Sequence, residues 1–297
     1  MAIERDPGAP ARHSDGRVAR AREVGLELAL ACHPAPTVAV TVLTTVLVAV
    51  AGNRWPTCVV ATLALLSGQL SIGWSNDLID ADRDAAAGRS DKPAAAGTIA
   101  RSTLMIATVM ALVCTVPLSF GLGWRAGLAH LTGVGAGWLY NLGVKATVAS
   151  PLPYAVAFGA LPAIATLATP DRSWPPGWAI LAGSLIGVAA HFGNVLPDIT
   201  EDLAEGVRGL PQRIGRRASA LTAALAVVAA TIVILIGPSR TPSALDWACF
   251  CLVVLLAVSG VASNARNPRS EVAFYAVMAA AALDIVLIAL SHGLTVS

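Results

Sequence analysis

Long apolar segments alternate with short polar segments along the whole chain. Nine of them are long enough to cross about 30 Å of hydrocarbon, at 26–51, 56–79, 101–120, 123–141, 151–168, 176–196, 218–237, 245–263 and 272–291. Backbone groups in lipid must be satisfied within each segment, and these segments are too long and too uniformly apolar for barrel strands. The pattern therefore predicts an all-α integral membrane protein, a bundle of about nine transmembrane helices. Pro34 and Pro36 should kink or shorten the first helix.

Composition agrees with a membrane protein. Of the 297 residues, 56% are hydrophobic and 13% are charged, and the mean hydropathy is +0.69. A net charge of +2 gives no reason to expect nucleic acid binding. The five cysteines lie scattered in apolar runs without zinc-site spacing, which favours buried thiols. We expect residues 1–23 to form a cytoplasmic tail without a cleavable signal peptide, and residues 24–297 to form a single transmembrane domain.

A polar motif follows the second apolar segment, with Asn76, Asp80 and Asp84 at intervals of four. In a helix this spacing places the three side chains on one face, within about 12 Å of length. Oxygen ligands are the donors that Mg²⁺ prefers, and Mg²⁺ usually keeps coordination positions for water or substrate phosphates. The motif therefore predicts a Mg²⁺ site.

A similar motif follows the sixth apolar segment and contains Asn194, Asp198 and Asp202. Half of the 18 acidic residues lie in or near the two motifs. Gathered carboxylates in a partly desolvated cavity need cations to stay ionised. Pro197 should bend the sixth helix and could turn Asp198 and Asp202 toward the first motif.

The lysines and arginines predict the orientation. If the N-terminus is inside, the cytoplasmic segments carry sixteen of the 20 Lys and Arg residues, and the outer loops carry only Arg54, Arg125, Arg172 and Arg240. The positive-inside rule then favours a cytoplasmic N-terminus and places both acidic motifs, after helices 2 and 6, on the cytoplasmic side. A bacterial cytoplasmic membrane is the expected location.

Two metal–carboxylate clusters that face each other suit a bridging diphosphate, because the metals neutralise its charge and stabilise the leaving group. The basic residues on the same side that could contact the diphosphate are Lys92, Lys145, Arg208 and Arg213. Apolar cavity walls predict a hydrocarbon chain on that diphosphate. An allylic isoprenoid diphosphate meets both requirements, because its ionisation leaves a delocalised carbocation for a nucleophile to capture.

At this point the chain resembles the UbiA-type superfamily of intramembrane prenyltransferases over roughly residues 25–291. The resemblance rests on Asn76-x-x-x-Asp80-x-x-x-Asp84 with the continuation Arg89-Ser-Asp-Lys92-Pro93 to Gly97, and on Asp198-x-x-x-Asp202-x-x-x-Gly206 followed by Leu210-Pro-Gln-Arg213-Ile-Gly215.

The resemblance implies two Mg²⁺ ions held by the residues of the two motifs, with the prenyl diphosphate between them. Asp80 and Asp198 are the first candidates for catalysis. Tyr140 and Lys145 look similar to a Tyr and a Lys of the family after the fourth span, although their interval is one residue longer here. Asn194 stands where relatives often have Asp, and its amide oxygen can still bind Mg²⁺ with less charge.

Two further polar residues lie inside apolar segments. His191 is favoured as a hydrogen-bonded packing residue over one that polarises an acceptor. Asp284, midway along the last segment, must face the bundle interior. The sequence leaves open whether it makes a helix–helix hydrogen bond or contacts substrate.

We therefore expect Mg²⁺-dependent transfer of a prenyl group from an isoprenoid diphosphate to a hydrophobic or aromatic acceptor, in contact with membrane lipids. One alternative is a terpene cyclase that uses no acceptor, which the shortage of rings other than Trp74 and Trp138 near the cavity slightly disfavours. Another is a secondary transporter, although both motifs fall at one membrane face rather than at the midplane. Chain length, acceptor and oligomeric state are left open.

Overall fold

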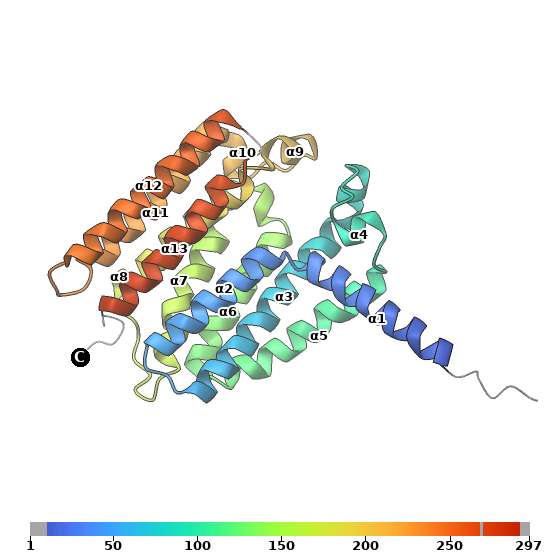
Figure 1. The fold of residues 1–297 in the computed structure, drawn as a ribbon, viewed down its shortest axis with the longest axis horizontal. Helices are drawn as coiled ribbons and strands as arrows, with labels where there is room; N and C mark the ends of the chain where they lie inside the picture. The colour runs from blue at the N-terminus through green and yellow to red at the C-terminus, as the bar shows by residue number, and fades with distance from the viewer. Residues whose placement is uncertain (1–10, 268–269, 292–297) are drawn as a thin grey trace, which may run out of the picture.

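The computed structural model describes residues 11–267 and 270–291, and within these ranges the chain is helical, without strands (Figure 1). The helices in chain order are α1 (Ala11–Ala31), α2 (Pro34–Val50), α3 (Trp55–Ala86), α4 (Pro93–Ala96), α5 (Arg101–Phe120), α6 (Trp124–Asn141), the 3₁₀ helix η1 (Val144–Ala146), α7 (Leu152–Leu167), α8 (Gly177–Val195), α9 (Ile199–Ala204), α10 (Leu210–Ile214), α11 (Arg216–Ile236), α12 (Ala244–Arg266) and α13 (Val272–Ser291).

The prediction of an all-helical membrane protein is confirmed. Each of the nine predicted apolar segments overlaps one of the long helices. By length and composition, five helices in the described ranges could cross a membrane: α3, α5, α8, α11 and α12. The number becomes six if the bent pair of α1 and α2 forms one span. Large apolar side chains such as Ile106, Leu225 and Leu255 are exposed on the outside of the bundle, as expected for a surface that faces lipid.

The first predicted segment is broken in two. α1 ends at Ala31, α2 begins at Pro34, and the two helices are bent by 74°. Pro34 has no N–H to continue a helix and disfavours helical geometry in the residue before it. That residue, His33, takes the left-handed conformation with φ 54°. The expected effect of the prolines is thus a sharp break, and it places His33 at a corner of the chain.

Glycines allow the helices around the centre of the bundle to approach closely. A Cβ at Gly183 would lie 2.6 Å from the carbonyl oxygen of Phe158, and a Cβ at Gly187 would lie 2.3 Å from that of Tyr154. Small residues spaced by four permit such contact between membrane helices. The α7–α8 pair therefore packs backbone to backbone, which leaves other faces of α7 to line the interior.

A second close approach fixes the corner between α1 and α2. A Cβ at Gly73 on α3 would lie 2.5 Å from the carbonyl oxygen of Cys32. The corner consequently sits one turn before Asn76, at the start of the first motif. The short helices α4, α9 and α10 lie at this same end of the bundle (Figure 1), so the connections that carry polar residues gather in one place.

Candidate functional site

The first motif lies on the last turns of α3, with its carboxylates facing inward. Asp80 and Asp84 are 3% and 1% exposed. Asp80 accepts hydrogen bonds from Lys145 on η1 and from Arg83, whose Nη2 lies 2.9 Å away. Asp84 pairs with Lys92 in the loop after α3, at 2.9 Å. Two lysines far apart in the sequence thus converge on one helix face.

Asn76, one turn before Asp80, is oriented by two residues that sequence reasoning missed. Its amide nitrogen donates to Asn141 Oδ1 at 3.1 Å, and Asn141 in turn donates to the carbonyl of Ile72. His33, at the α1–α2 corner, also hydrogen-bonds the side chain of Asn76. The Asn76 amide therefore has a fixed orientation at the end of the motif.

The second motif lies on a turn and a short helix, and not on one continuous helix face. α8 ends at Val195, two residues before Pro197, and α9 begins at Ile199 with Asp198 as its N-cap residue. A proline disfavours helix at the preceding residue, so the chain breaks here where the sequence predicted a bend. Asp202 on α9 accepts a hydrogen bond from Gln212 on α10 at 2.7 Å.

Arginines connect the two motifs. Arg83, at the end of α3, donates from Nε to Glu205 Oε2 at 3.1 Å while it pairs with Asp80 at 2.9 Å. Arg89, in the loop after α3, acts electrostatically on both Asp84 and Asp198. The two acidic motifs, 118 positions apart in the sequence, therefore lie within reach of the same cationic side chains.

Burial controls the charges of the groups at this end of the bundle. It raises the pKa of the Asp198 carboxyl, and it raises the pKa of Asp202 to about 6, with the Gln212 hydrogen bond opposing the shift. Burial also lowers the pKa of Lys145, while the neighbouring Asp80 opposes that change. The second motif thus has acidic groups that a nearby cation would favour in their charged form.

The donor set suits Mg²⁺ that is shared with a substrate. Among the described residues, no three His, Cys, Asp or Glu side chains gather closely enough to hold an ion alone. Mg²⁺ commonly takes only one or two carboxylates and completes its octahedron with water and phosphate oxygens. Hard oxygen donors in two facing groups, with buried and partly uncompensated carboxylates, meet that requirement.

An aromatic cluster adjoins the motifs. The Tyr140 ring centroid lies 5.2 Å from that of Tyr154 and 5.7 Å from that of His191, and Tyr154 stacks on Phe158 at 6.3 Å. Asp80, Asp198 and Asp202 all act electrostatically on Tyr140. Tyr140 therefore sits between the two motifs and the aromatic rings.

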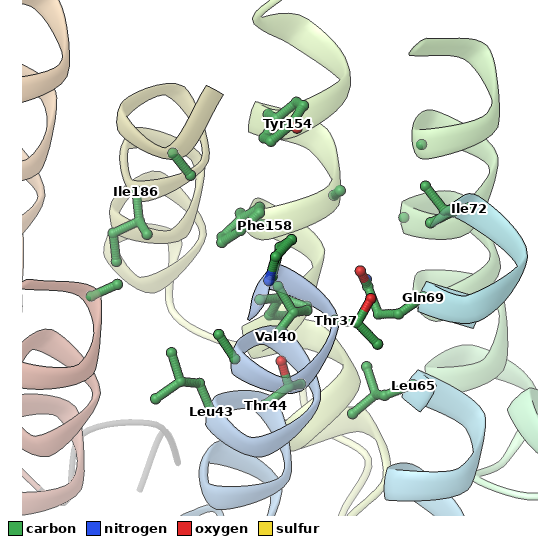
Figure 2. Close-up of a pocket in the computed structure, with 18 of the residues that line it drawn as sticks. Thr37, Val40, Leu43, Thr44, Leu65, Gln69, Ile72, Tyr154, Phe158 and Ile186 are labelled. Atoms are coloured by element: carbon green, nitrogen blue, oxygen red, sulfur yellow. The ribbon is translucent and has the colours of Figure 1, made fainter. Parts of the chain in front are cut away.

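A cavity of about 280 Å³ extends from this end into the bundle. At the end near the motifs its wall includes His33, Asn76, Tyr140 and Asn194. Farther into the bundle the wall is formed largely by apolar residues of α2, α3, α7, α8 and α13. Figure 2 shows Tyr154, Phe158 and Ile72 bordering the same pocket as Leu43 and Leu65. The polar end and the apolar interior are thus one continuous space.

The other predicted residues fall into different settings. Arg208 and Arg213 are exposed, and Arg213 donates to the carbonyl of Arg208 at 2.7 Å. His191 is buried, with Nε2 3.0 Å from Ser150 Oγ. Asp284 is fully buried beside Thr231 on α11 and outside the cavity wall, so it belongs to a helix–helix interface.

Several residues of the site carried no sequence signal of their own. Nothing in the sequence distinguishes Arg83 from a surface arginine, and Asn141, Tyr154 and Phe158 lie in apolar segments where they resemble packing residues. A signal was available only for Asn141, because it adjoins Tyr140 and an amide at the end of a membrane helix needs a partner.

Comparison with known proteins identifies the family. A family model described as the UbiA prenyltransferase family matches residues 33–285. No curated protein matches the chain. The family match confirms the resemblance predicted from the two motifs.

Solved structures share the fold at low sequence identity. A UbiA homolog from Archaeoglobus fulgidus bound to GPP and Mg²⁺ has a TM-score of 0.68 at 14% identity, covering 88% of this chain and 97% of that chain. The apo structure of a UbiA homolog from Aeropyrum pernix K1 has a TM-score of 0.67 at 16% identity, covering 86% and 97%. A structure of digeranylgeranylglyceryl phosphate synthase has a TM-score of 0.62 at 16% identity, covering 91% of this chain and 98% of that chain.

Proposed function

The chain belongs to the UbiA prenyltransferase family, and on that premise we propose that it transfers a prenyl group from an isoprenoid diphosphate to an aromatic or lipid-precursor acceptor, with Mg²⁺ as cofactor. The observation that carries the proposal is the convergence of both acidic motifs at the polar end of one apolar cavity. Arg83 pairs with Asp80 of the first motif and with Glu205, which lies three residues after Asp202 of the second motif. A diphosphate with a hydrocarbon chain matches a space that is charged at one end and apolar along its length.

In this proposal the side chains of the two motifs hold the metal ions. The first set is Asn76, Asp80 and Asp84, and the second is Asn194, Asp198 and Asp202. Bound Mg²⁺ would neutralise the diphosphate and stabilise it as a leaving group. Structures of the related UbiA homolog from Archaeoglobus fulgidus are bound to GPP and Mg²⁺ or to DMAPP and Mg²⁺, which supports the same pairing here.

Basic and aromatic side chains complete the proposed site. Lys145 and Lys92 are placed to bind diphosphate oxygens, because each already lies against a motif carboxylate. Arg208 and Arg213 would have to turn inward from exposed positions to do the same. The rings of Tyr140 and Tyr154 lie next to the expected position of the allylic carbocation and would stabilise its charge through their faces.

We also propose nine membrane spans with the N-terminus on the cytoplasmic side of a bacterial membrane. The support is the presence of a helix in every predicted segment and the excess of Lys and Arg on one side. Residues 1–23 would then form a cytoplasmic tail, and residues 24–297 the single catalytic domain. Both motifs would open toward the cytoplasm.

A cyclase without an acceptor is the second candidate, and the aromatic cluster favours it more than the sequence did. Tyr140, Tyr154 and Phe158 line the cavity, whereas Trp74 and Trp138, the two rings expected near it, are not among its lining residues. Cyclisation would join carbons of one chain and release a proton, whereas transfer forms a bond to a second molecule. The secondary transporter has no comparable support.

Product analysis separates these functions. Purified protein would be incubated with Mg²⁺ and prenyl diphosphates of increasing chain length, with and without a phenol or quinone precursor. Transfer predicts diphosphate release that depends on the acceptor and a product with the mass of acceptor plus prenyl group. Cyclic hydrocarbon formed without acceptor would support the cyclase instead. Absence of diphosphate release under every condition would refute both.

A further inference from the structure

Polar side chains also line the middle of the cavity, well away from the acidic motifs. His130 on α6, Gln69 on α3 and Thr44 on α2 all belong to the cavity wall, and we refer to them as the mid-cavity group. Figure 2 shows Gln69 and Thr44 extending toward the pocket among apolar side chains such as Leu43 and Leu65. The diphosphate site does not account for them.

Helix geometry gives the depth of this group. Gln69 lies seven residues before Asn76 on α3, which corresponds to about 10 Å along the axis. His130 lies ten residues before Tyr140 on α6, which corresponds to about 15 Å. A diphosphate bound between the motifs ends well above this level, so whatever contacts the mid-cavity group belongs to another part of the bound molecules.

Hydrogen bonding fixes the tautomer of His130. Ser119 Oγ lies 2.6 Å from the carbonyl oxygen of Thr115, which can only accept, so the Ser119 proton is directed there. His130 Nδ1 lies 2.7 Å from the same Ser119 oxygen and must therefore donate its own proton to it. In the neutral ring Nε2 then carries the lone pair. Since His130 is 4% exposed and lines the cavity, this acceptor is available to a ligand there.

Thr44 supplies an independent unsatisfied group. It is 0% exposed, and its hydroxyl has no hydrogen-bond partner in the described part of the chain. The adjacent Thr45 instead donates to the carbonyl of Thr41 at 2.8 Å, and Thr132 on α6 does the same with Leu128. In a hydrocarbon environment an unpaired hydroxyl is costly. An isoprenoid chain at this level would leave Thr44 and His130 Nε2 unpaired.

We propose that the mid-cavity group binds an alcohol or phenol hydroxyl carried by the lipid substrate that fills the cavity. The hydroxyl donates to His130 Nε2, and its oxygen, which has two lone pairs, accepts from both the Gln69 amide and Thr44. The inference rests on the proposed function in one respect, that the cavity holds a lipid substrate. It narrows that lipid substrate to one with a hydroxyl about 10–15 Å, along the helix axes, from the level of Asn76 and Tyr140.

A comparison of two simple probes tests this site. Full-length protein in detergent, with Mg²⁺ and inorganic pyrophosphate present to occupy the motif end, is titrated with 1-decanol and with decane, and the rise in Tm gives an apparent Kd for each. The ratio of the two constants in a variant is compared with the wild-type ratio, so that partitioning into micelles cancels. One hydrogen bond corresponds to about a fivefold preference for the alcohol.

Gln69→Met and Thr44→Val keep the shape of the side chains and should each reduce the preference for decanol about fivefold. Thr45→Val and Thr132→Val, on the same helices but bonded to their own backbone, should keep the wild-type ratio. An equal ratio in wild type and in the Gln69 and Thr44 variants overturns the proposal, because water or nothing would then occupy the site.

Two additional results keep the test decisive. If the variants fail to fold, the lipids that co-purify with the wild-type protein are identified by mass spectrometry. A hydroxyl-bearing lipid is expected, and its absence would overturn the proposal. If pyrophosphate does not raise the Tm, the proposed function is in doubt, while the decanol and decane comparison can still be made without it.

Discussion

Substitution of Gly187 by alanine should separate α7 from α8 and disorganise the aromatic side of the site. A Cβ at this position would lie 2.3 Å from the carbonyl oxygen of Tyr154 and 2.9 Å from Cβ of Phe158. Ordinary contact needs about 3.5 Å, so the two helices must move apart by about 1 Å. Overpacking of this kind costs about 1–3 kcal/mol. Both aromatic residues would be carried away from Tyr140.

The expected result is a large fall in the catalytic rate together with a moderate fall in Tm. A displacement of about 1 Å at a substrate-positioning element can lower the rate about 100-fold, whereas the Tm should fall by roughly 2–10 °C. Diphosphate release from geranyl diphosphate with Mg²⁺ measures the first, and a thermal shift assay measures the second. Gly135→Ala is the matched control, because a Cβ at Gly135 meets nothing within 4 Å. If Gly187→Ala matched Gly135→Ala in rate and Tm, the argument from helix contact would be wrong.

Three further predictions concern the charged end of the site. Asp80→Ala and Asp198→Ala should each lower diphosphate release about 10²–10³-fold while Asp171→Ala, exposed in the α7–α8 loop, stays near wild type; full activity in both would refute the assignment of the motifs. Arg83→Gln should weaken Mg²⁺ binding or activity about 10–100-fold, measured by activation curves against Mg²⁺ concentration, and an unchanged curve would show that the link between motifs is dispensable. Burial raises the pKa of Asp202 from its usual 3.8 to about 6, and the carboxyl must lose its proton before a cation binds. Calorimetric titration should therefore give a Mg²⁺ affinity that falls up to about tenfold for each pH unit below 6. In metal-free protein the protonated carboxyl stabilises the fold fully below pH 3.8, and this contribution is lost as pH rises through about 6; Asp202→Asn should abolish the accompanying fall in Tm, and a flat wild-type profile would contradict the shift.

Hydropathy predicted the helices well because every membrane-spanning helix needs about 20 mostly apolar residues. The segment 101–120 coincides with α5, and 176–196 differs from α8 by one residue at each end. The first segment is interrupted where the sequence predicted a kink at Pro34 and Pro36, and the interruption is a complete break between two helices. Pro34 and the left-handed His33 end one helix and begin another, and hydropathy averaged over a window cannot detect a single residue with unusual dihedral angles.

Sequence spacing predicted the positions of site residues that share one continuous helix. It could not predict positions that depend on contacts between distant segments. Intervals of four placed Asn76, Asp80 and Asp84 on one face of a helix that continues through them. The same interval around Asp198 does not lie on a helix face, because Pro197 ends α8 first. The sequence made Lys92 and Lys145 candidates, and both contact motif carboxylates.

The aromatic side of the site could not be predicted. Tyr154 and Phe158 face the cavity because Gly183 and Gly187 bring α8 against the backbone of α7. Nothing in an apolar segment distinguishes an inward ring from one that faces lipid until the neighbouring helix is placed. The Arg83 link between the motifs has the same origin, since its partner Glu205 is 122 positions away.

The pairing of Asp80 with Lys145 and of Asp84 with Lys92 gives the first motif its own counter-charges. If this end binds Mg²⁺ and diphosphate as proposed, binding would exchange these ion pairs for new ones. In the proposed function the carboxylates would bind the divalent ions and the two freed ammonium groups would bind phosphate oxygens, so each charge would keep a partner of opposite sign. The rate of substrate binding should then depend more on how fast the two lysine–carboxylate pairs dissociate than on how often a substrate molecule reaches the site.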